Sequence, residues 1–214
     1  MSGSLISVDD TGVIVVDVQA DFTELKSGAL AVPGTDIHYI DDVQKATRRF
    51  QAQGLRIYFT LDWHPVDHIS FYTNNPGTEP FQEVEIEEGR TQVMWPPHCV
   101  QNTPGAMILN TADGPVRTVQ KGMGPKFDSY SGFADDGGHK TELGNLLQED
   151  GIKKVLVYGL ATDYCVLATG IDARARDYPT TMLAAGMRAV DLQPGDGEKA
   201  LAELRLAGAF VDEG

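Results

Sequence analysis

The chain has 214 residues, of which 42% are apolar and 22% are charged, with 31 acidic against 17 basic side chains. That length suits one globular domain with a sizeable core and leaves little room for a second. The formal net charge of −14 argues against partners such as nucleic acid or an anionic membrane surface, because both would repel the protein.

Two further exclusions come from apolar runs and cysteine usage. No apolar run reaches the length of about 18 residues that a membrane-spanning helix needs. Residues 1–10 are polar and acidic and lack the basic start and apolar stretch of a signal peptide. Cys99 and Cys165 are far apart in sequence, and without an export signal we expect reduced thiols and a cytoplasmic location.

Short apolar runs alternate along the chain with segments of helical periodicity. In chain order, the expected strands cover residues 13–16, 57–60, 116–119, 155–158, 180–184 and 209–211. The expected helices cover residues 37–53, 141–148, 164–175 and 197–206. Runs 13–16, 57–60 and 155–158 are continuous rather than alternating, which is typical of strands buried on both faces of a parallel sheet.

This alternation predicts an α/β fold of βαβ units with right-handed crossovers. We expect residues 1–214 to form one Rossmann-like domain, a three-layer sandwich with a central, mainly parallel six-stranded sheet and helices on both faces. Residues 62–94 contain no expected element, and loops of that length in compact domains are usually functional. Ligands of open α/β sheets bind at the carboxyl ends of the strands, so the residues at those ends are candidates for a site.

Three of the strand ends carry the groups that covalent catalysis requires. Asp17 follows the first strand, Lys121 follows the third, and Cys165 lies in the first turn of the helix after the fourth. Backbone N–H groups at a helix start favour a thiolate, so we expect a lowered pKa for Cys165. An acid, a cation and a thiol together form a base, an electrostatic partner and a nucleophile. The structural alternatives are a capping carboxylate, a surface lysine and a buried apolar thiol.

A carboxylate and three histidines follow the second strand, in a segment that we interpret as a metal-binding insertion loop over residues 62–98. Asp62, His64 and His68 fall within seven residues, and His98 comes later. Three protein ligands would leave open positions for water or substrate, as in a catalytic metal site. Such a set suits one divalent ion, Zn²⁺ first, with Fe²⁺ or Mn²⁺ as alternatives. Cys99 is a weaker candidate ligand than its neighbour His98, and hydrogen-bonded loop histidines are the structural alternative.

Six motifs in order resemble the nicotinamidase (pyrazinamidase) branch of the isochorismatase-like cysteine hydrolases. The resemblance is collinear over residues 13–191, and the motifs together are highly specific although each alone is only moderately so. They are Asp17-x-Gln19-x-Asp21-Phe22, Asp62-Trp63-His64-Pro65-x-x-His68, Trp95-Pro96-x-His98-Cys99-Val100, Lys121-Gly122, Ser129-Tyr130-Ser131-x-Phe133 and Ala161-Thr162-Asp163-Tyr164-Cys165-Val166.

The resemblance implies a catalytic triad of Asp17, Lys121 and Cys165. It also implies a non-proline cis peptide bond between Leu160 and Ala161 and an oxyanion hole formed by the backbone N–H groups of Ala161 and Cys165. The implied activity is hydrolysis of nicotinamide, and of pyrazinamide, to the acid and ammonia through a thioester, in NAD salvage.

For the metal, the resemblance implies Asp62, His64 and His98 as ligands, with His68 either a fourth ligand or a supporting group. The family pattern suggests that the ion anchors the pyridine nitrogen of the substrate, with water activation as the rival role. The positions that match pocket-lining residues of the family are Phe22, Trp95 and Tyr164. The expected partner is a small-molecule substrate, with a homo-oligomer as an option that the sequence leaves open.

Three alternatives stay open at this point. The chain could be another isochorismatase-like hydrolase acting on isochorismate, a carbamoyl compound or a ureide, although the Asp-Trp-His segment favours the metal-using branch. It could be a non-catalytic module that keeps the fold and binds a metal or a partner. It could also hydrolyse its substrate with a metal-bound hydroxide while Cys165 is only structural.

Overall fold

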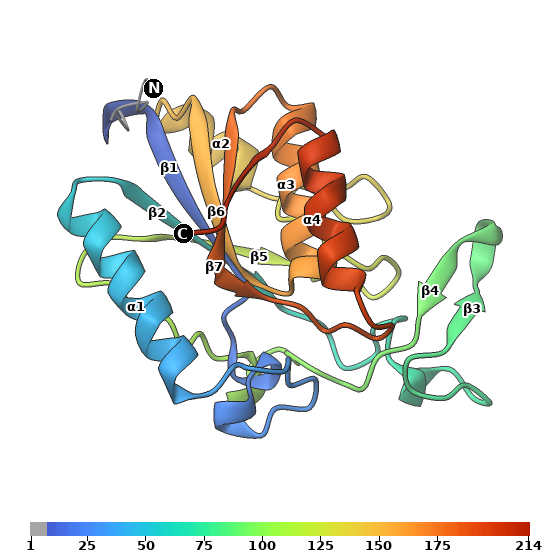
Figure 1. Ribbon diagram of the computed structural model, residues 1–214. Coiled ribbons are helices and arrows are strands. Elements are labelled where there is room, and N and C mark those ends of the chain that lie inside the picture. Colours follow the sequence, from blue (N-terminus) through green and yellow to red (C-terminus); the bar gives the residue numbers. More distant parts are fainter. Residues whose placement is uncertain (1–7) are drawn as a thin grey trace.

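A computed structural model describes residues 8–214, and it contains the central sheet that the sequence predicts (Figure 1). Most of residues 1–10, predicted not to be a signal peptide, lies outside the described residues. Six strands form one sheet in the order β5-β2-β1-β6-β7-β8, and all their pairings are parallel. Their bounds are β1 Thr11–Val16, β2 Arg56–Asp62, β5 Arg117–Lys121, β6 Lys154–Leu160, β7 Thr180–Arg188 and β8 Phe210–Asp212.

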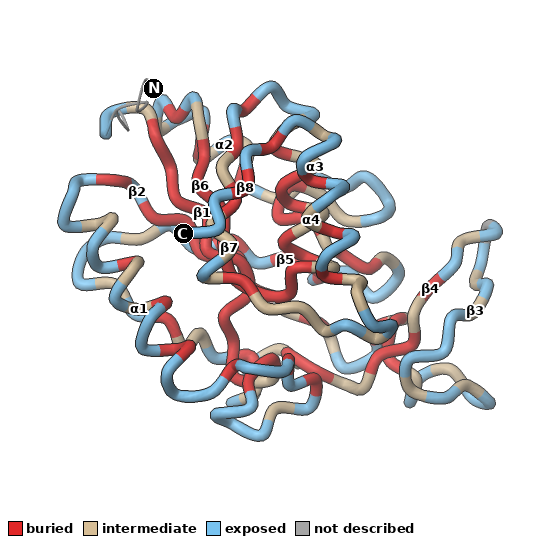
Figure 2. Tube along the Cα trace, viewed as in Figure 1, coloured by how far each residue is buried: buried red, intermediate tan, exposed pale blue. Residues whose placement is uncertain are grey.

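Strand β1 lies at the centre of the sheet, and all six of its residues are buried. Burial on both faces explains its unbroken apolar run, because neither face of a covered parallel strand meets water. Figure 2 shows the same buried band running through the middle of the molecule, with exposed backbone on the outer helices and loops.

Four α-helices cover the two faces of the sheet. Tyr158 on β6 shares a hydrogen bond of 2.6 Å with Thr47, which places α1 on one face. On the opposite face, a Cβ atom at Gly132 would lie 3.0 Å from the side chain of Thr60 on β2 and 3.1 Å from that of Leu143 on α2, and the Gly132 N–H donates to Thr169 on α3 at 2.9 Å. The predicted three-layer α/β arrangement is therefore confirmed. The helices are α1 Ile37–Ala52, α2 Leu143–Glu149, α3 Leu167–Ala175 and α4 Asp196–Leu206, with a π-helical turn at Thr162–Val166 before α3.

The long segment after β2 contains regular structure that the sequence did not predict. Strands β3 Glu83–Glu85 and β4 Thr91–Val93 pair antiparallel in a separate two-stranded sheet. This hairpin projects from the body of the molecule at the right of the view (Figure 1). The expectation of an irregular stretch over residues 62–94 was therefore wrong, because three-residue strands are too short to produce a readable apolar pattern.

The parallel register brings the candidate residues to one edge of the sheet. Asp62 and Lys121 are paired partners at the ends of β2 and β5, and Val16 is paired with both Thr60 and Gly159. Asp17 and the turn after β6 therefore start from the same level, as expected for the carboxyl edge of an open α/β sheet. Within the described residues, no helix is long and apolar enough to cross a membrane.

Candidate active site and metal centre

The ammonium group of Lys121 lies at the centre of the site. Its side chain is fully buried and forms an ion pair with Asp17 Oδ2 at 2.9 Å. It forms a second ion pair with Asp62 and donates to the Ser129 carbonyl oxygen at 2.6 Å. Its Nζ also lies 3.4 Å from Cys165 Sγ. Burial alone would lower the pKa of Lys121, but the carboxylates of Asp17 and Asp62 raise it well above its usual range, so the group stays charged.

Asp17 is held in a buried position directly after β1. Its backbone turns sharply, with a left-handed φ of 49°, and Thr60 Oγ1 donates to its Oδ1 at 2.6 Å. Burial raises the pKa of Asp17 and the charge of Lys121 opposes the rise. The raised pKa makes this carboxylate a stronger base than an exposed aspartate, which suits a group that must accept a thiol proton.

Cys165 lies in the π-helical turn Thr162–Val166, where the chain leaves β6. The peptide bond between Leu160 and Ala161 is cis, as the family resemblance implied. Burial raises the pKa of the Cys165 thiol well above its usual range, and Lys121 only partly opposes this. Our expectation of a lowered pKa was therefore wrong, because loss of solvent around the sulfur outweighs the helix start. The thiol needs a base, and Asp17 lies beside it.

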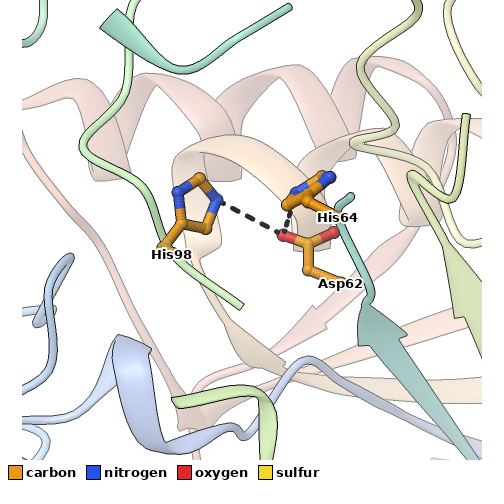
Figure 3. Close-up of side chains that lie close together, drawn as sticks. All are labelled: Asp62, His64 and His98. Carbon is orange, nitrogen blue, oxygen red and sulfur yellow. Dashed lines mark ion pairs between the residues drawn. The ribbon is translucent and has the colours of Figure 1, made fainter. Parts of the chain in front are cut away.

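The candidate metal ligands Asp62, His64 and His98 form a second cluster. It adjoins the first cluster, which is centred on Lys121. One ligand atom of each lies within 4.8 Å of the others. Asp62 Oδ2 is 3.5 Å from His64 Nε2 and 3.8 Å from His98 Nε2, and both rings point toward it (Figure 3). Asp62 therefore joins the two clusters, since its other oxygen faces Lys121.

The hydrogen bonds of the two imidazoles leave the correct nitrogens free for a metal ion. His64 Nδ1 donates to the Gly122 carbonyl at 3.1 Å, and His98 Nδ1 donates to the Pro96 carbonyl at 2.7 Å. A carbonyl oxygen only accepts, so in each neutral ring Nε2 keeps its lone pair. Among the described residues, His64 Nε2 is a buried nitrogen without a hydrogen-bond partner. This donor set fits a divalent cation.

Protonation of these histidines follows from burial and from Asp62. Burial lowers the pKa of His98 to about 4, helped by the positive charge of His64. Burial also acts to lower the pKa of His64, but Asp62 raises it above its ordinary value. His98 is thus neutral and ready to bind at neutral pH, whereas a metal ion would compete with a proton for His64.

The structure does not bring His68 into the ligand cluster. Its Nδ1 is 2.7 Å from Ser70 Oγ, and its Nε2 donates to the Phe127 carbonyl at 3.1 Å. Its ring packs on the ring of His64 with the centroids 4.3 Å apart. In this arrangement His68 supports the position of His64.

Gly122 shows why the Lys121-Gly122 pair is required at this place. Its φ of 63° is left-handed, and a Cβ atom there would collide with the His64 ring. A glycine thus lets the chain after β5 pass close enough to His64 to accept its Nδ1 proton.

A small pocket, with a cavity volume of about 30 Å³, opens onto both clusters. Its lining includes Cys165, Asp62 and His98, together with the predicted lining residues Phe22, Trp95 and Tyr164. Aromatic rings pack edge to face here, as the Trp95 and Tyr164 centroids are 5.0 Å apart. The lining is therefore rich in aromatic side chains, which suits a small planar aromatic ligand.

Several residues of the site were not assigned a role from the sequence. Tyr130 lines the pocket and accepts a hydrogen bond of 3.0 Å from Trp95 Nε1. Asp128, also in the lining, is buried and accepts from Gln92 Nε2 at 2.8 Å. Tyr130 was visible as part of a motif with no assigned role, whereas Asp128 carries no local signal.

Comparison with known proteins agrees with this geometry. The model of the isochorismatase domain family matches residues 11–212. The nicotinamidase of Escherichia coli (strain K12) is 38% identical over 201 residues, which cover 92% of each chain.

Two solved structures have the same fold over nearly the whole chain. The pyrazinamidase of Pyrococcus horikoshii in complex with zinc has a TM-score of 0.79 and 35% identity, covering 96% of this chain and 99% of that one. The yeast nicotinamidase bound to the inhibitor nicotinaldehyde has a TM-score of 0.86 and 30% identity, covering 95% and 100%. The chain therefore belongs to the isochorismatase family and, within it, to the nicotinamidase branch.

Proposed function

We propose that this protein hydrolyses nicotinamide to nicotinic acid and ammonia, with pyrazinamide as a second substrate, in NAD salvage. The observation that carries the proposal is the convergence of three buried groups, of which Cys165 lines the aromatic pocket. Lys121 Nζ lies 2.9 Å from the carboxylate of Asp17 and 3.4 Å from the sulfur of Cys165. Relatives named for nicotinamide and pyrazinamide hydrolysis support the choice of substrate.

In the first half of the proposed reaction, Cys165 Sγ attacks the carboxamide carbon while Asp17 accepts the thiol proton. The carbonyl oxygen becomes an oxyanion, held by the backbone N–H groups of Ala161 and Cys165, which both line the pocket. Asp17 then gives its proton to the departing nitrogen, so the C–N bond breaks and ammonia leaves. The product of this half is a thioester on Cys165.

In the second half, Asp17 takes a proton from water, and the resulting hydroxide attacks the thioester carbon. The C–S bond breaks, the sulfur regains a proton, and nicotinic acid leaves. Lys121 keeps its charge throughout, so it holds Asp17 in place and stabilises the transient thiolate. Thr60 contributes by holding the second oxygen of Asp17 at 2.6 Å.

We propose that Asp62, His64 and His98 hold one divalent ion, zinc before iron or manganese, with the loop over residues 62–98 as the metal-binding segment. The zinc complex of the pyrazinamidase relative supports this choice. When bound, the ion offers a coordination position to the pyridine nitrogen and adds positive charge beside the sulfur. His68 would serve as a supporting residue, since both its nitrogens are engaged elsewhere.

The remaining pocket walls orient the substrate ring. Phe22 packs on the His98 ring with centroids 5.4 Å apart, and the rings of Trp95 and Tyr130 both contact that of Tyr164 in the same lining. A flat ring held in this way presents its amide to the nucleophile in one orientation. Such positioning lowers the activation barrier, because the entropy of aligning the two groups is lost on binding.

The test is ammonia release from nicotinamide by purified, zinc-supplemented protein, with pyrazinamide and a carbamoyl amide as further substrates. Cys165→Ala should abolish release, and Cys99→Ala is the matched control because it removes the other thiol of the chain. Release from the carbamoyl compound alone would favour a different hydrolase. Full turnover by Cys165→Ala would favour a metal-bound hydroxide as the nucleophile.

We also propose that the protein works in the cytoplasm as a single domain over residues 1–214. Both cysteines are free thiols in the structure, and a catalytic thiol needs a reducing compartment. Fractionation with and without a thiol-blocking reagent would test the location.

A further inference from the structure

The segment after β1 carries two polar side chains, Gln19 and Asp21, that the proposed reaction does not use. Gln19 is fully buried and forms hydrogen bonds with both polar backbone groups of Asp62. Its Nε2 donates to the Asp62 carbonyl at 2.8 Å, and its Oε1 accepts from the Asp62 N–H at 2.9 Å. The same amide also donates to the Ala106 carbonyl at 3.0 Å. Two of these three bonds hold the backbone of the carboxylate ligand, and the third ties Gln19 to the segment around Ala106.

Asp21 holds the backbone next to the histidine ligands, as Gln19 holds that of Asp62. Its Oδ2 accepts from the Cys99 N–H at 2.8 Å, and that N–H belongs to the peptide bond after His98. The Cys99 carbonyl in turn accepts from the His64 N–H at 3.1 Å. Cys99 has a left-handed φ of 46°, a conformation unusual for a residue with a side chain. One carboxylate thus holds the short link between the two histidines.

The surroundings of Asp21 leave little freedom for its carboxylate. A Cβ atom at Gly105 would collide with the carboxylate, and one at Gly28 would collide with its backbone carbonyl. The neighbouring Phe22 ring packs on His98 at 5.4 Å between centroids. The backbone at Gly105 therefore approaches Asp21 so closely that the carboxylate has little room to move away from Cys99, and its Oδ1 also accepts from the Ala29 N–H at 3.5 Å.

We propose that Gln19 and Asp21 are positioning residues that set the three metal ligands relative to the nucleophile. Both lie on the segment that begins with Asp17, so one stretch of chain carries the proposed base and fixes the metal centre beside it. This inference rests on the proposed metal-dependent function. Partners that orient metal ligands are typically worth about 10- to 100-fold in metal affinity.

The experiment measures the affinity of metal-free protein for Zn²⁺ by competition with a chromophoric chelator. Asp21→Ala and Gln19→Met should each weaken zinc binding by about 10- to 100-fold. Asp21→Asn keeps an oxygen that can accept from the Cys99 N–H, so it should recover most of the affinity lost in Asp21→Ala. Asp41→Asn is the matched control, because it removes the same charge from an exposed position on α1 and should bind zinc like the wild type.

A second readout separates positioning from a merely structural role. A structural role would lower the melting temperature of the metal-free and the zinc-loaded protein equally, whereas a positioning role shrinks the increase that zinc produces. If zinc anchors the substrate ring, the variants should also raise KM more than they lower kcat. Alkylation of Cys165 in the metal-free variants should proceed at the wild-type rate.

The outcomes distinguish this inference from the proposed function. Wild-type protein that releases ammonia and binds zinc, with unchanged zinc affinity in folded Asp21→Ala and Gln19→Met, overturns the inference alone. If Asp21→Ala does not fold, Gln19→Met decides, and an unchanged affinity there has the same meaning. Wild-type protein that binds no zinc overturns the inference together with the metal-dependent part of the proposed function.

Discussion

Replacement of Lys121 by methionine tests the electrostatic design of the site. Methionine keeps most of the length and volume of the side chain but removes the charge that lies between Asp17 and Asp62. In the variant, at least one buried carboxylate loses its counter-charge. Removing one partner of a buried ion pair typically costs about 3–5 kcal/mol. A domain of this size loses roughly 2–4 °C in Tm for each kcal/mol, so the expected decrease is on the order of 6–20 °C.

The loss should depend on pH in a defined direction. Without Lys121, the pKa of Asp17 rises further above its unfolded value, because burial is no longer opposed by an ammonium group. A buried carboxyl with a raised folded-state pKa costs least free energy when it is protonated. The loss of stability of the variant relative to wild type should therefore be small in acid and grow as the pH rises through that pKa. Cys165 should also react more slowly, since Lys121 is the group that lowers its thiol pKa.

Urea unfolding near pH 5 and near pH 8, together with the rate of iodoacetamide labelling at Cys165, measures both effects in metal-free protein. Lys153→Met is the matched control, because Lys153 is exposed and its loss should change neither quantity. The reasoning would be refuted by a Lys121→Met protein that unfolds within about 1 kcal/mol of wild type near pH 8 and labels at the wild-type rate.

Three further predictions follow from individual contacts. Partial loss of solvent and the nearby carboxylates of Asp128 and Asp135 raise the pKa of the exposed residue Asp136 to about 6, so stability is lost as the pH rises from about 4 through 6. Asp136→Asn should therefore stabilise the protein near pH 8 by about 1 kcal/mol after screening by solvent, and not near pH 4, in paired urea titrations. Tyr130→Phe leaves the Trp95 N–H without its acceptor. The variant should lose about 0.5–1.5 kcal/mol of stability in unfolding curves and show a raised KM in steady-state kinetics. An unchanged KM would argue against a role of this pair in the pocket. Chelation should raise KM strongly, and added zinc should restore it; turnover that is insensitive to a chelator in protein verified as metal-free would exclude the anchoring role.

Much of the fold was readable because buried parallel strands leave an unambiguous signal. The continuous runs at residues 13–16, 57–60 and 155–158 correspond to β1, β2 and β6, and the expected helix over residues 37–53 corresponds to α1, Ile37–Ala52. The hairpin of β3 and β4 was missed because its strands have three residues each and their one buried residue, Gln92, is polar. Short strands held by a partner of similar length leave no periodicity to detect.

The residues of the site likewise divide into those that the sequence reveals and those that it does not. Asp17, Lys121 and the candidate ligands carry local signals, since each lies directly after a strand or in a histidine-rich segment. The pKa of Cys165 was expected in the wrong direction, because burial of a sulfur atom cannot be read from its position in a helix. The contacts of Gln19 and Asp21 were also invisible, because they join residues 43 and 78 positions apart.

The most direct test of the central claim is to trap the covalent intermediate. Rapid acid quench of nicotinamide turnover, followed by peptide mass spectrometry, should show one nicotinoyl group on the peptide that contains Cys165 and none on the peptide that contains Cys99. The Cys165→Ala protein should show no adduct and no ammonia release. Steady turnover without any adduct, together with an active Cys165→Ala protein, would contradict the account.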